Sequence, residues 1–247
     1  MSKAPTVTVG GTREEMLYDS PVFRIMGDRS MLVELGDDVS VTVNARVKEL
    51  FWGLEARFVE GLVDIIPSYR SLLLIYDPAR ASLPTLKKLV QKIWAAGQCL
   101  QIPEPQKIKV PVVYGGEFGP DLKWVSDYLG LTPEEVIQYH TSVTYRVYMI
   151  GFTPGYPYMG ELPDAIVTPR RKTPRIRVPR GSVGIAQKQT GIYPVASPGG
   201  WQIIGCTPIQ LFDPCKEPPT PLQMGDRVTF YAISAEEMHT WQQQEII

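Results

Sequence analysis

The sequence predicts two domains, an α+β domain over residues 1–102 and a mostly-β domain over residues 103–247. In the first part of the chain, apolar stripes typical of helices alternate with short apolar runs typical of strands. The segment Pro-Glu-Pro-Gln at residues 103–106 marks the boundary, because paired prolines stiffen a connection and resist helix formation. From Tyr145 to about residue 236, glycine-rich turns separate short runs without a long helical period, which favours a barrel or a sandwich.

Composition and charge exclude several classes of function. The 247 residues suffice to bury a real core, and the net charge of −1 gives no global field that favours nucleic acid or an anionic membrane. No apolar run approaches the ~20 residues of a membrane span, and the first residues lack the apolar segment of a signal peptide. The cysteines Cys99, Cys206 and Cys215 show no metal-binding spacing. We therefore expect them to be small apolar side chains of a cytoplasmic protein in a reducing compartment, without a bound metal.

The strands of the first domain are predicted from short apolar runs between turns. Two are expected at residues 22–26 and 31–35, on either side of a glycine–aspartate turn, and two more at residues 58–66 and 71–76. Residues 1–20 show no sustained period, so we expect a partly ordered tail there.

Two helices complete the first domain. Apolar residues step by three and four from 39 to 54, after a predicted cap at Asp37 and Asp38. A second helix is expected from Ser82 to Gly97, where a left-handed C-terminal cap is expected. A last strand near residues 99–102 would lead out of the domain. The polar residues of the first domain show no catalytic spacing, which favours a structural or docking role for this domain.

The second domain begins with an expected strand at residues 107–113, in which Pro111 indicates an edge or an entry. A short helix that ends at a glycine is expected over residues 121–129. The sequence Thr-Pro-Glu-Glu at residues 132–135 is typical of a capping box with proline at the first helical position, and it predicts a helix over residues 136–140.

Residues 145–213 are the most unusual stretch of the chain. Glycine permits a positive φ and a close approach of the backbone, proline fixes φ, and aromatic residues at such positions make walls. We therefore expect a pocket rim of rigid turns with cations and tyrosines between them. Further on, a glycine–aspartate turn precedes residues 227–231, which we expect to form the closing strand of the domain.

The segment from Pro169 to Arg180 holds six cations and no acid, with prolines at a five-residue period. Such spacing holds guanidinium groups apart and suits the recognition of a carboxylate or a phosphate. The alternative is a solvated edge strand that charge and proline protect. Because the whole chain is nearly neutral, a small anion or an acidic partner fits better than nucleic acid.

Other candidates are single polar residues near this segment. His140 precedes the strand-rich region, and a structural role competes with a catalytic one. Gln189, Thr190 and Tyr193 lie among glycines and offer neutral hydrogen bonds suited to an amide, although each would also fit a tight hairpin. Neither a G-x-S-x-G elbow nor a G-x-x-x-x-G-K-[ST] loop occurs in the sequence, so we predict neither a serine nucleophile nor a P-loop nucleotide site.

Several segments resemble the allophanate hydrolase subunit 1 family, which has carboxyltransferase domains of the C/D type. They are Gly-Phe-Thr-Pro-Gly-Tyr-Pro-Tyr-Met-Gly at 151–160, Thr-Pro-Arg-Arg at 168–171, Val-Pro-Arg-Gly-Ser-Val at 178–183, Thr-Gly-Ile-Tyr-Pro at 190–194 and Ser-Pro-Gly-Gly-Trp-Gln-Ile-Ile-Gly at 197–205. Residues 63–74 and 76–78 also look like the first domain of that family. The resemblance covers most of the chain.

The resemblance implies a small α+β first domain and a cyclophilin-like β-barrel second domain. It also implies a partner, the subunit 2 protein, which is similar to the C-type subunit of 5-oxoprolinase. Among family members, the 5-oxoprolinase assignment implies ATP-driven opening of 5-oxoproline to glutamate, a further A-type subunit, and ATP with Mg bound with or by the partner subunits. The sequence departs from the family pattern at two places near the expected pocket rim, and these departures bear on the identity of the substrate more than on the fold. Cys206 stands where a basic residue is frequent, and Gln187-Lys188 where small residues are frequent.

Two hypotheses of different classes follow. In the first, the chain is a non-autonomous subunit of an ATP-dependent amide or lactam hydrolase, in which cations and fixed donors stabilise an anionic intermediate and a histidine relays a proton. In the second, it is a Kip-like inhibitor that grips a sensor histidine kinase in an aromatic groove. The predicted catalytic residues are His140, Arg171 and Gln189. The predicted substrate- or partner-binding residues are Phe152, Tyr156, Tyr158, Arg170, Arg175, Thr190, Gly191, Tyr193, Ser197 and Trp201.

Overall fold

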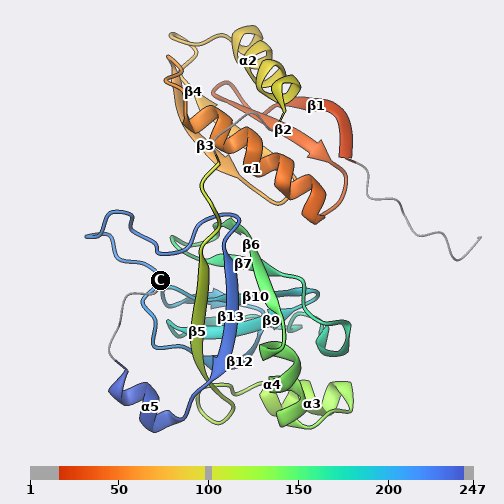
Figure 1. Ribbon diagram of the computed structural model, residues 1–247, viewed down its shortest axis with the longest axis vertical. Coiled ribbons are helices and arrows are strands. Elements are labelled where there is room, and N and C mark those ends of the chain that lie inside the picture. The colour runs from red at the N-terminus through yellow and green to blue at the C-terminus, as the bar shows by residue number, and fades with distance from the viewer. Residues whose placement is uncertain (1–16, 98–101, 242–247) are drawn as a thin grey trace, which may run out of the picture. The chain divides into compact units, whose positions relative to one another are not determined.

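The computed structural model describes residues 17–97 and 102–241, and the chain divides into two compact units, Met1–Leu100 and Gln101–Ile247 (Figure 1). The first unit is an antiparallel sheet with two helices, and the second is a barrel with short helices. None of the helices within these described ranges is long and apolar enough to cross a membrane.

The first unit contains a four-stranded antiparallel sheet in the order β1-β2-β4-β3. Its elements are β1 (Leu17–Ile25), β2 (Ser30–Gly36), α1 (Val41–Glu55), β3 (Leu62–Pro67), β4 (Ser71–Tyr76) and α2 (Leu83–Ala96). Helix α1 packs against β2, β3, β4 and α2, and α2 also packs against β1. Every second residue of β4 is buried, so one face of the sheet supplies the core that the helices cover.

Two strand boundaries predicted for this unit are wrong. Residues 17–20 lie in β1 and not in a tail, because the pairing of β1 with β2 extends back to Leu17. Strand β3 begins at Leu62 and not at residue 58, because a turn closed by the amide of Leu62 and the carbonyl of Val59 precedes it. The rest of the predicted tail, and most of the strand predicted near residues 99–102, lie outside the described residues.

The ends of both helices follow the chemistry of their caps. Ser40 caps α1, because its hydroxyl accepts a hydrogen bond from the Val43 amide at 3.1 Å, so the cap predicted at Asp37 and Asp38 lies too early in the chain. Ser82 caps α2 as expected. The left-handed cap predicted at Gly97 is wrong, because its ψ of −148° lies outside the left-handed helical region. Its φ of +62° is nevertheless one that favours glycine.

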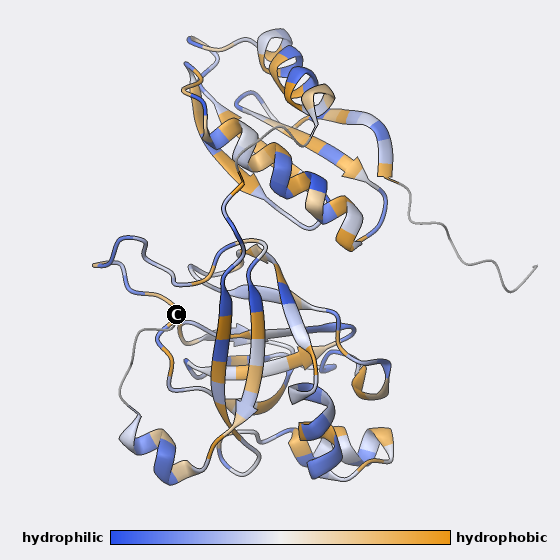
Figure 2. Ribbon diagram, viewed as in Figure 1, coloured by the Kyte–Doolittle hydropathy of each residue, from blue (hydrophilic) through white to orange (hydrophobic). Residues whose placement is uncertain are grey.

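The second unit is a closed seven-stranded barrel in the order β10-β7-β6-β13-β5-β12-β9, which confirms the predicted mostly-β barrel. Its strands are β5 (Lys107–Tyr114), β6 (Thr144–Ile150), β7 (Pro157–Gly160), β9 (Ser182–Ala186), β10 (Gln189–Ile192), β12 (Gln202–Cys206) and β13 (Arg227–Ala232). Hydrophobic and hydrophilic residues alternate in the first half of β5 and of β13 (Figure 2), because one side of the wall faces the core and the other faces outward. A large apolar cluster that includes Val110, Tyr145 and Val228 forms the core of the barrel.

Strand β5 lies within the wall, between β12 and β13, so the edge position inferred from Pro111 is wrong. The pairs between β12 and β5 involve only Val113 and Tyr114 of β5, whereas β13 runs parallel to residues 107–112. Pro111, which has no amide hydrogen, therefore stands where β12 makes no pair with β5.

Short helices and a two-stranded sheet flank the barrel. They are α3 (Leu122–Leu129), α4 (Pro133–Thr141), the 3-10 helix η1 (Asp164–Ile166), α5 (Ala235–Thr240), and the pair β8 (Arg175–Val178) and β11 (Ser197–Gly199). The helix predicted over residues 121–129 ends at a glycine as expected, because Gly130 follows α3 in the left-handed conformation. The capping box of α4 is also confirmed, because the side chains of Thr132 and Glu135 each accept a hydrogen bond from the other's backbone amide.

Candidate functional site

The barrel wall separates two clusters of buried side chains. Adjacent residues of a strand point to opposite sides, so Ile204 of β12 packs in the barrel core while Ile203 packs on the other side of the wall. There Ile203 joins Tyr156, Val178 and Tyr193, and we call these four residues the outer cluster. Val178 belongs to β8, so the β8–β11 sheet contributes to this second cluster.

Aromatic rings extend the outer cluster. The ring of Tyr156 lies 4.8 Å from that of Tyr158, 5.1 Å from that of Tyr193 and 5.9 Å from that of Trp201. Edge-to-face contacts such as those with Tyr193 and Trp201 are favourable arrangements of aromatic pairs. Gly191 leaves room for this packing, because a Cβ at this position would lie 2.7 Å from the Tyr156 hydroxyl oxygen. These five predicted binding residues are therefore close together in the structure.

The charge of Arg170 affects the pKa values of two tyrosines in and beside this cluster. Burial raises the pKa of Tyr193, while hydrogen bonds from Tyr156 and from the backbone of Trp201 and the charge of Arg170 act in the opposite direction. Burial also raises the pKa of Tyr158, again against the charge of Arg170. The exposed Arg170 thus influences hydroxyl groups of two predicted binding residues.

Asp121 anchors the basic segment. Its Oδ1 accepts hydrogen bonds from Arg171 Nη1 at 3.0 Å and from Arg175 Nη2 at 2.7 Å, and its Oδ2 accepts one from the Ile203 amide at 2.6 Å. The Asp121 side chain is 6% exposed, whereas those of Arg171 and Arg175 are 35% and 24% exposed. One buried carboxylate therefore holds two cations against β12 and leaves the three side chains with a net charge of +1.

Sequence reasoning missed the role of Asp121. This residue was predicted only as the start of a helix, and its side chain makes no capping hydrogen bond with α3. Its partners Arg171 and Arg175 lie 50 and 54 positions further along the chain. No local pattern in the sequence identifies an ion pair of such separation.

Several buried polar atoms near this anchor have no hydrogen-bond partner in the described part of the chain. They are Thr168 Oγ1, Arg171 Nε, Arg175 Nη1, Ser197 Oγ and Gln202 Oε1. The segments that carry them are neighbours, because Gln202 Nε2 donates to the Pro169 carbonyl at 3.1 Å and the Arg171 amide donates to the Gly200 carbonyl at 2.8 Å. Buried polar groups are normally paired, so a ligand with both donors and acceptors suits this region.

His140 lies inside the barrel. Its side chain is fully buried, 4.5 Å from the Phe230 ring. The Thr190 hydroxyl donates its one proton to the Gly184 carbonyl at 3.1 Å, so it accepts from His140 Nε2 at 2.9 Å. The other ring nitrogen, Nδ1, then accepts from the Tyr114 hydroxyl at 2.8 Å.

Burial lowers the pKa of His140 to about 3, so the ring is neutral at neutral pH. Both ring nitrogens are used within the barrel, as is typical of a structural histidine. The catalytic role of His140 stays a prediction.

Successive side chains of β10 point to opposite sides of the barrel wall, so the predicted site residues of this strand do not all lie on one side. Thr190 contacts His140 on the inner side, whereas Gly191 adjoins Tyr156 on the outer side. Gln189 begins the strand, where it is half-buried and pairs with Gly160 and Ala186. The outer cluster and its arginines therefore form one group, and His140 with Thr190 forms another.

Phe152 stands beside the outer cluster in an unusual backbone conformation. It is 61% exposed, and its ring lies 5.8 Å from that of Tyr156 in an edge-to-face contact. Its φ is +65°, which is rare for an aromatic residue. Backbone strain of this kind clusters at binding and active sites, so Phe152 fits its predicted binding role.

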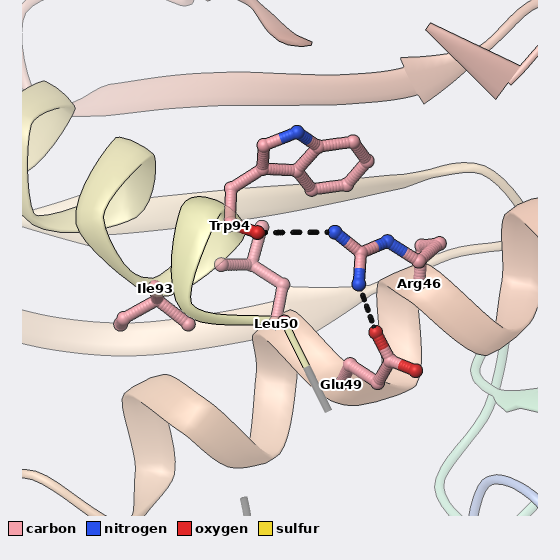
Figure 3. Close-up of a pocket in the computed structure, with 6 residues that line it drawn as sticks. Arg46, Glu49, Leu50, Ile93 and Trp94 are labelled. Atoms are coloured by element: carbon pink, nitrogen blue, oxygen red, sulfur yellow. Dashed lines mark hydrogen bonds and ion pairs between the residues drawn. The ribbon is translucent and has the colours of Figure 1, made fainter. Parts of the chain in front are cut away.

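The first unit has a small hollow between α1 and α2 that Arg46 adjoins (Figure 3). The Arg46 guanidinium stacks on the Trp94 ring at 4.1 Å, donates to the Trp94 carbonyl at 3.1 Å and pairs with Glu49. A cation that binds a carbonyl at the end of a helix stabilises that end, so we assign Arg46 a structural role.

The described residues contain no group of three or more His, Cys, Asp and Glu side chains arranged to hold a metal ion. Cys206 is half-buried, and burial raises the pKa of its thiol. Cys215 is exposed, so the expectation of a buried apolar side chain is wrong for this residue. Cys99 lies outside the described residues.

Proteins of known sequence and structure resemble the chain over most of its length. A protein of Bacillus subtilis (strain 168), named as the B subunit of 5-oxoprolinase, is 40% identical over 234 residues, which cover 89% of this chain and 95% of that protein. A protein of the same name from Escherichia coli O157:H7 is 42% identical over 209 residues, which cover 83% of this chain and 93% of that protein. The crystal structure of TTHA0988 matches with a TM-score of 0.75 and 39% identity, and covers 84% of this chain but 40% of the TTHA0988 chain.

A family model described as carboxyltransferase domain, subdomain C and D, matches residues 21–222. The matched range includes Asp121, the basic segment and the whole outer cluster. It also includes the segments at 151–160 and 197–205 that carry the resemblance seen in the sequence. The chain belongs to the family of the carboxyltransferase domain, subdomains C and D.

Proposed function

We propose that the chain is a non-autonomous subunit of an ATP-dependent hydrolase that opens a lactam, with 5-oxo-L-proline as substrate and L-glutamate as product. The observation that carries this proposal is the match to two proteins named as B subunits of 5-oxoprolinase, over 95% and 93% of their own lengths. The alignments cover almost the full length of both relatives, so nearly every segment of those proteins has an equivalent segment in this chain.

The outer cluster and its anchored arginines suit the chemistry of a lactam. Resonance makes an amide resistant to attack, and ATP supplies the activation of its carbonyl oxygen. Negative charge then develops on the substrate, and fixed cations and hydrogen-bond donors stabilise it best when they are held in place beforehand. Arg171 and Arg175 meet this requirement, because Asp121 holds both guanidinium groups.

The polar atoms without partners match the groups of 5-oxoproline. The N–H groups of Arg171 Nε and Arg175 Nη1 are donors suited to its carboxylate or its lactam oxygen. Gln202 Oε1 is an acceptor suited to the lactam N–H, which gives a binding role to a residue that the sequence did not single out. The rings of Tyr158 and Trp201 supply an apolar wall for the ring carbons of the substrate.

His140 and Gln189 have less direct roles in this proposal. His140 holds β10 through Thr190, and β10 in turn carries Gly191 beside Tyr156. The predicted function of His140 as a proton relay remains a hypothesis, as does the predicted function of Gln189 as a hydrogen-bond donor to the substrate.

Further subunits complete the proposed enzyme. We infer a subunit 2 partner that is similar to the C-type subunit of 5-oxoprolinase, together with an A-type subunit, and ATP with Mg that binds with or by these partners. The TTHA0988 chain supports such a partner, because this chain spans 40% of it and the remainder lies in the same polypeptide. The cyclophilin-like character of the barrel and a docking role for residues 1–102 belong to the same proposal.

An omission experiment tests the proposed function. The partner subunits are incubated with 5-oxoproline and ATP, with and without this chain, and glutamate is measured. We expect glutamate only in the presence of the chain. Equal glutamate formation by the partners alone would refute the proposal.

A Kip-like inhibitor of a sensor histidine kinase is the second candidate. The observation that favours it is the exposure of Phe152 and of Ile176, which is 91% exposed in β8 among the cations of the basic segment. Apolar side chains among cations suit a partner surface. Co-purification with a kinase dimerisation domain and not with a subunit 2 protein would favour the inhibitor, and the reverse result would favour the enzyme.

A further inference from the structure

A row of cations crosses three strands of the barrel wall. Arg227 of β13 lies opposite Lys107 of β5 on one side and opposite Arg146 of β6 on the other. A second row in the same register contains Lys109, Thr229 and Thr144. Every second residue of a strand faces the same side, and Val228 of β13 packs in the barrel core, so both rows lie on the outer face of the wall.

Within the described residues, no ion pair joins an acidic side chain to Lys107, Arg146 or Arg227. Among the described residues of the second unit, the cations in ion pairs are Lys123, Arg171, Arg175 and Lys188. The acid next to Arg227 in the chain, Asp226, is fully buried and accepts hydrogen bonds from the amides of Gln106 and Gln223. Burial lowers the pKa of Arg146, and the charge of Arg227 lowers it further, so these two guanidinium groups repel each other.

Like charges that lie directly opposite on neighbouring strands destabilise a sheet. The row from Lys107 to Arg146 is therefore an arrangement that folding alone does not favour. A bound anion would attract each of these cations and so offset the repulsion between them. Residues kept at a cost to stability are characteristic of functional sites.

Residues of both rows line a pocket. Its walls include Lys107, Lys109, Thr144, Arg227 and Thr229. Arg146 adjoins the row, and its Nε is buried without a hydrogen-bond partner in the described part of the chain. Strands lie about 4.8 Å apart, so the row spans about 10 Å from β5 to β6. A single carboxylate or phosphate contacts only part of such a row, whereas two or three linked phosphates match its length and its charge.

We propose that this pocket binds the linked phosphates of a small molecule, with Lys107, Arg227 and Arg146 contacting successive phosphate groups and the threonine hydroxyls donating to their oxygens. Inorganic triphosphate and nucleoside triphosphates share this chemistry. The site lies on β5, β13 and β6, and its central strand β13 is not a neighbour of the β9, β10 and β12 strands beside the outer cluster. It does not depend on the proposed lactam chemistry.

Calorimetry on the full chain at low salt tests this site, with inorganic triphosphate in one arm and ATP in the other. We expect saturable binding of one molecule of triphosphate per chain. Arg227→Gln should weaken it by about 10- to 100-fold, the equivalent of one charged hydrogen bond. Lys216→Gln removes an exposed cation of the same unit and should leave binding unchanged. Equal binding in both arms supports recognition of the phosphates alone, and tighter binding of ATP supports a nucleotide.

Three results would overturn the proposal. They are the absence of saturable binding in both arms, equal affinity of the wild type and Arg227→Gln, and binding of polyglutamate in place of triphosphate, which would indicate an acidic protein partner. Thermal unfolding without ligand supplies a second readout. The Arg227→Gln variant should unfold at a higher temperature than the wild type because repulsion is removed. A lower unfolding temperature would show that Arg227 serves the fold, and would also count against the site.

Discussion

Asp121 and Arg175 form a 2.7 Å ion pair although they lie 54 positions apart in the chain. The same carboxylate oxygen binds Arg171, and the other oxygen binds the amide of Ile203 in the outer cluster. Two of the six cations in the basic segment are therefore fixed by a buried acid, whereas the other four side chains are exposed. The position of Arg171 and Arg175 beside the aromatic wall follows from this one residue.

Replacement of Asp121 tests the anchor. Asp121→Asn keeps the size of the side chain and removes its charge, so the free energy of unfolding should fall by about 1–3 kcal/mol, the contribution of hydrogen bonds to a charged group. Urea denaturation measures this change. Asp127→Asn is the matched control, because its partner Lys123 is exposed and the loss should stay below about 0.5 kcal/mol. Equal losses in the two variants would contradict an anchoring role.

Gly191→Ala tests the packing of the outer cluster. The added Cβ would lie 2.7 Å from the Tyr156 hydroxyl oxygen, so overpacking should lower the free energy of unfolding by about 1–3 kcal/mol. Gly200→Ala is the control, because its Cβ would meet Pro174 at an ordinary 3.6 Å. Thermal denaturation compares the two. If Gly200→Ala is as destabilising as Gly191→Ala, the explanation for the glycine is wrong.

The buried His140 predicts a dependence of stability on pH. In the unfolded chain the imidazole takes up a proton below its ordinary pKa of 6.5, whereas in the folded chain it stays neutral until the pH approaches about 3. The unfolded state therefore binds more protons between these values. The stability that the neutral ring contributes is complete above pH 6.5 and is lost as the pH falls, by about 1.4 kcal/mol per pH unit.

Chemical denaturation between about pH 7 and 4.5 measures this loss. His140→Gln should reduce the slope of stability against pH, because the titrating group is gone. His239→Gln removes the exposed histidine of α5 and should leave the slope unchanged. An unaltered slope in His140→Gln would show that His140 does not stay neutral in the folded chain.

The sequence predicted features that depend on neighbouring residues. The capping box of α4 and the glycine after α3 follow from interactions within one helical turn, and the barrel follows from the change to short runs and glycine-rich turns. The ion pairs of Asp121 depend on the closed fold, so no local pattern indicated them. The separation of Thr190 from Gly191 was predictable, because the side chains of adjacent strand residues face opposite ways.

The rate of glutamate formation from 5-oxoproline and ATP, measured with the complete set of subunits, tests the central claim most directly. The comparison is between the wild-type chain, Arg171→Gln and the control Lys123→Gln, whose exposed cation lies on α3. Circular dichroism confirms that each variant is folded. We predict that Arg171→Gln lowers the rate by about 100-fold or more, as the loss of a donor to developing charge does, while Lys123→Gln keeps the wild-type rate. A folded Arg171→Gln variant with the wild-type rate would contradict the proposed site.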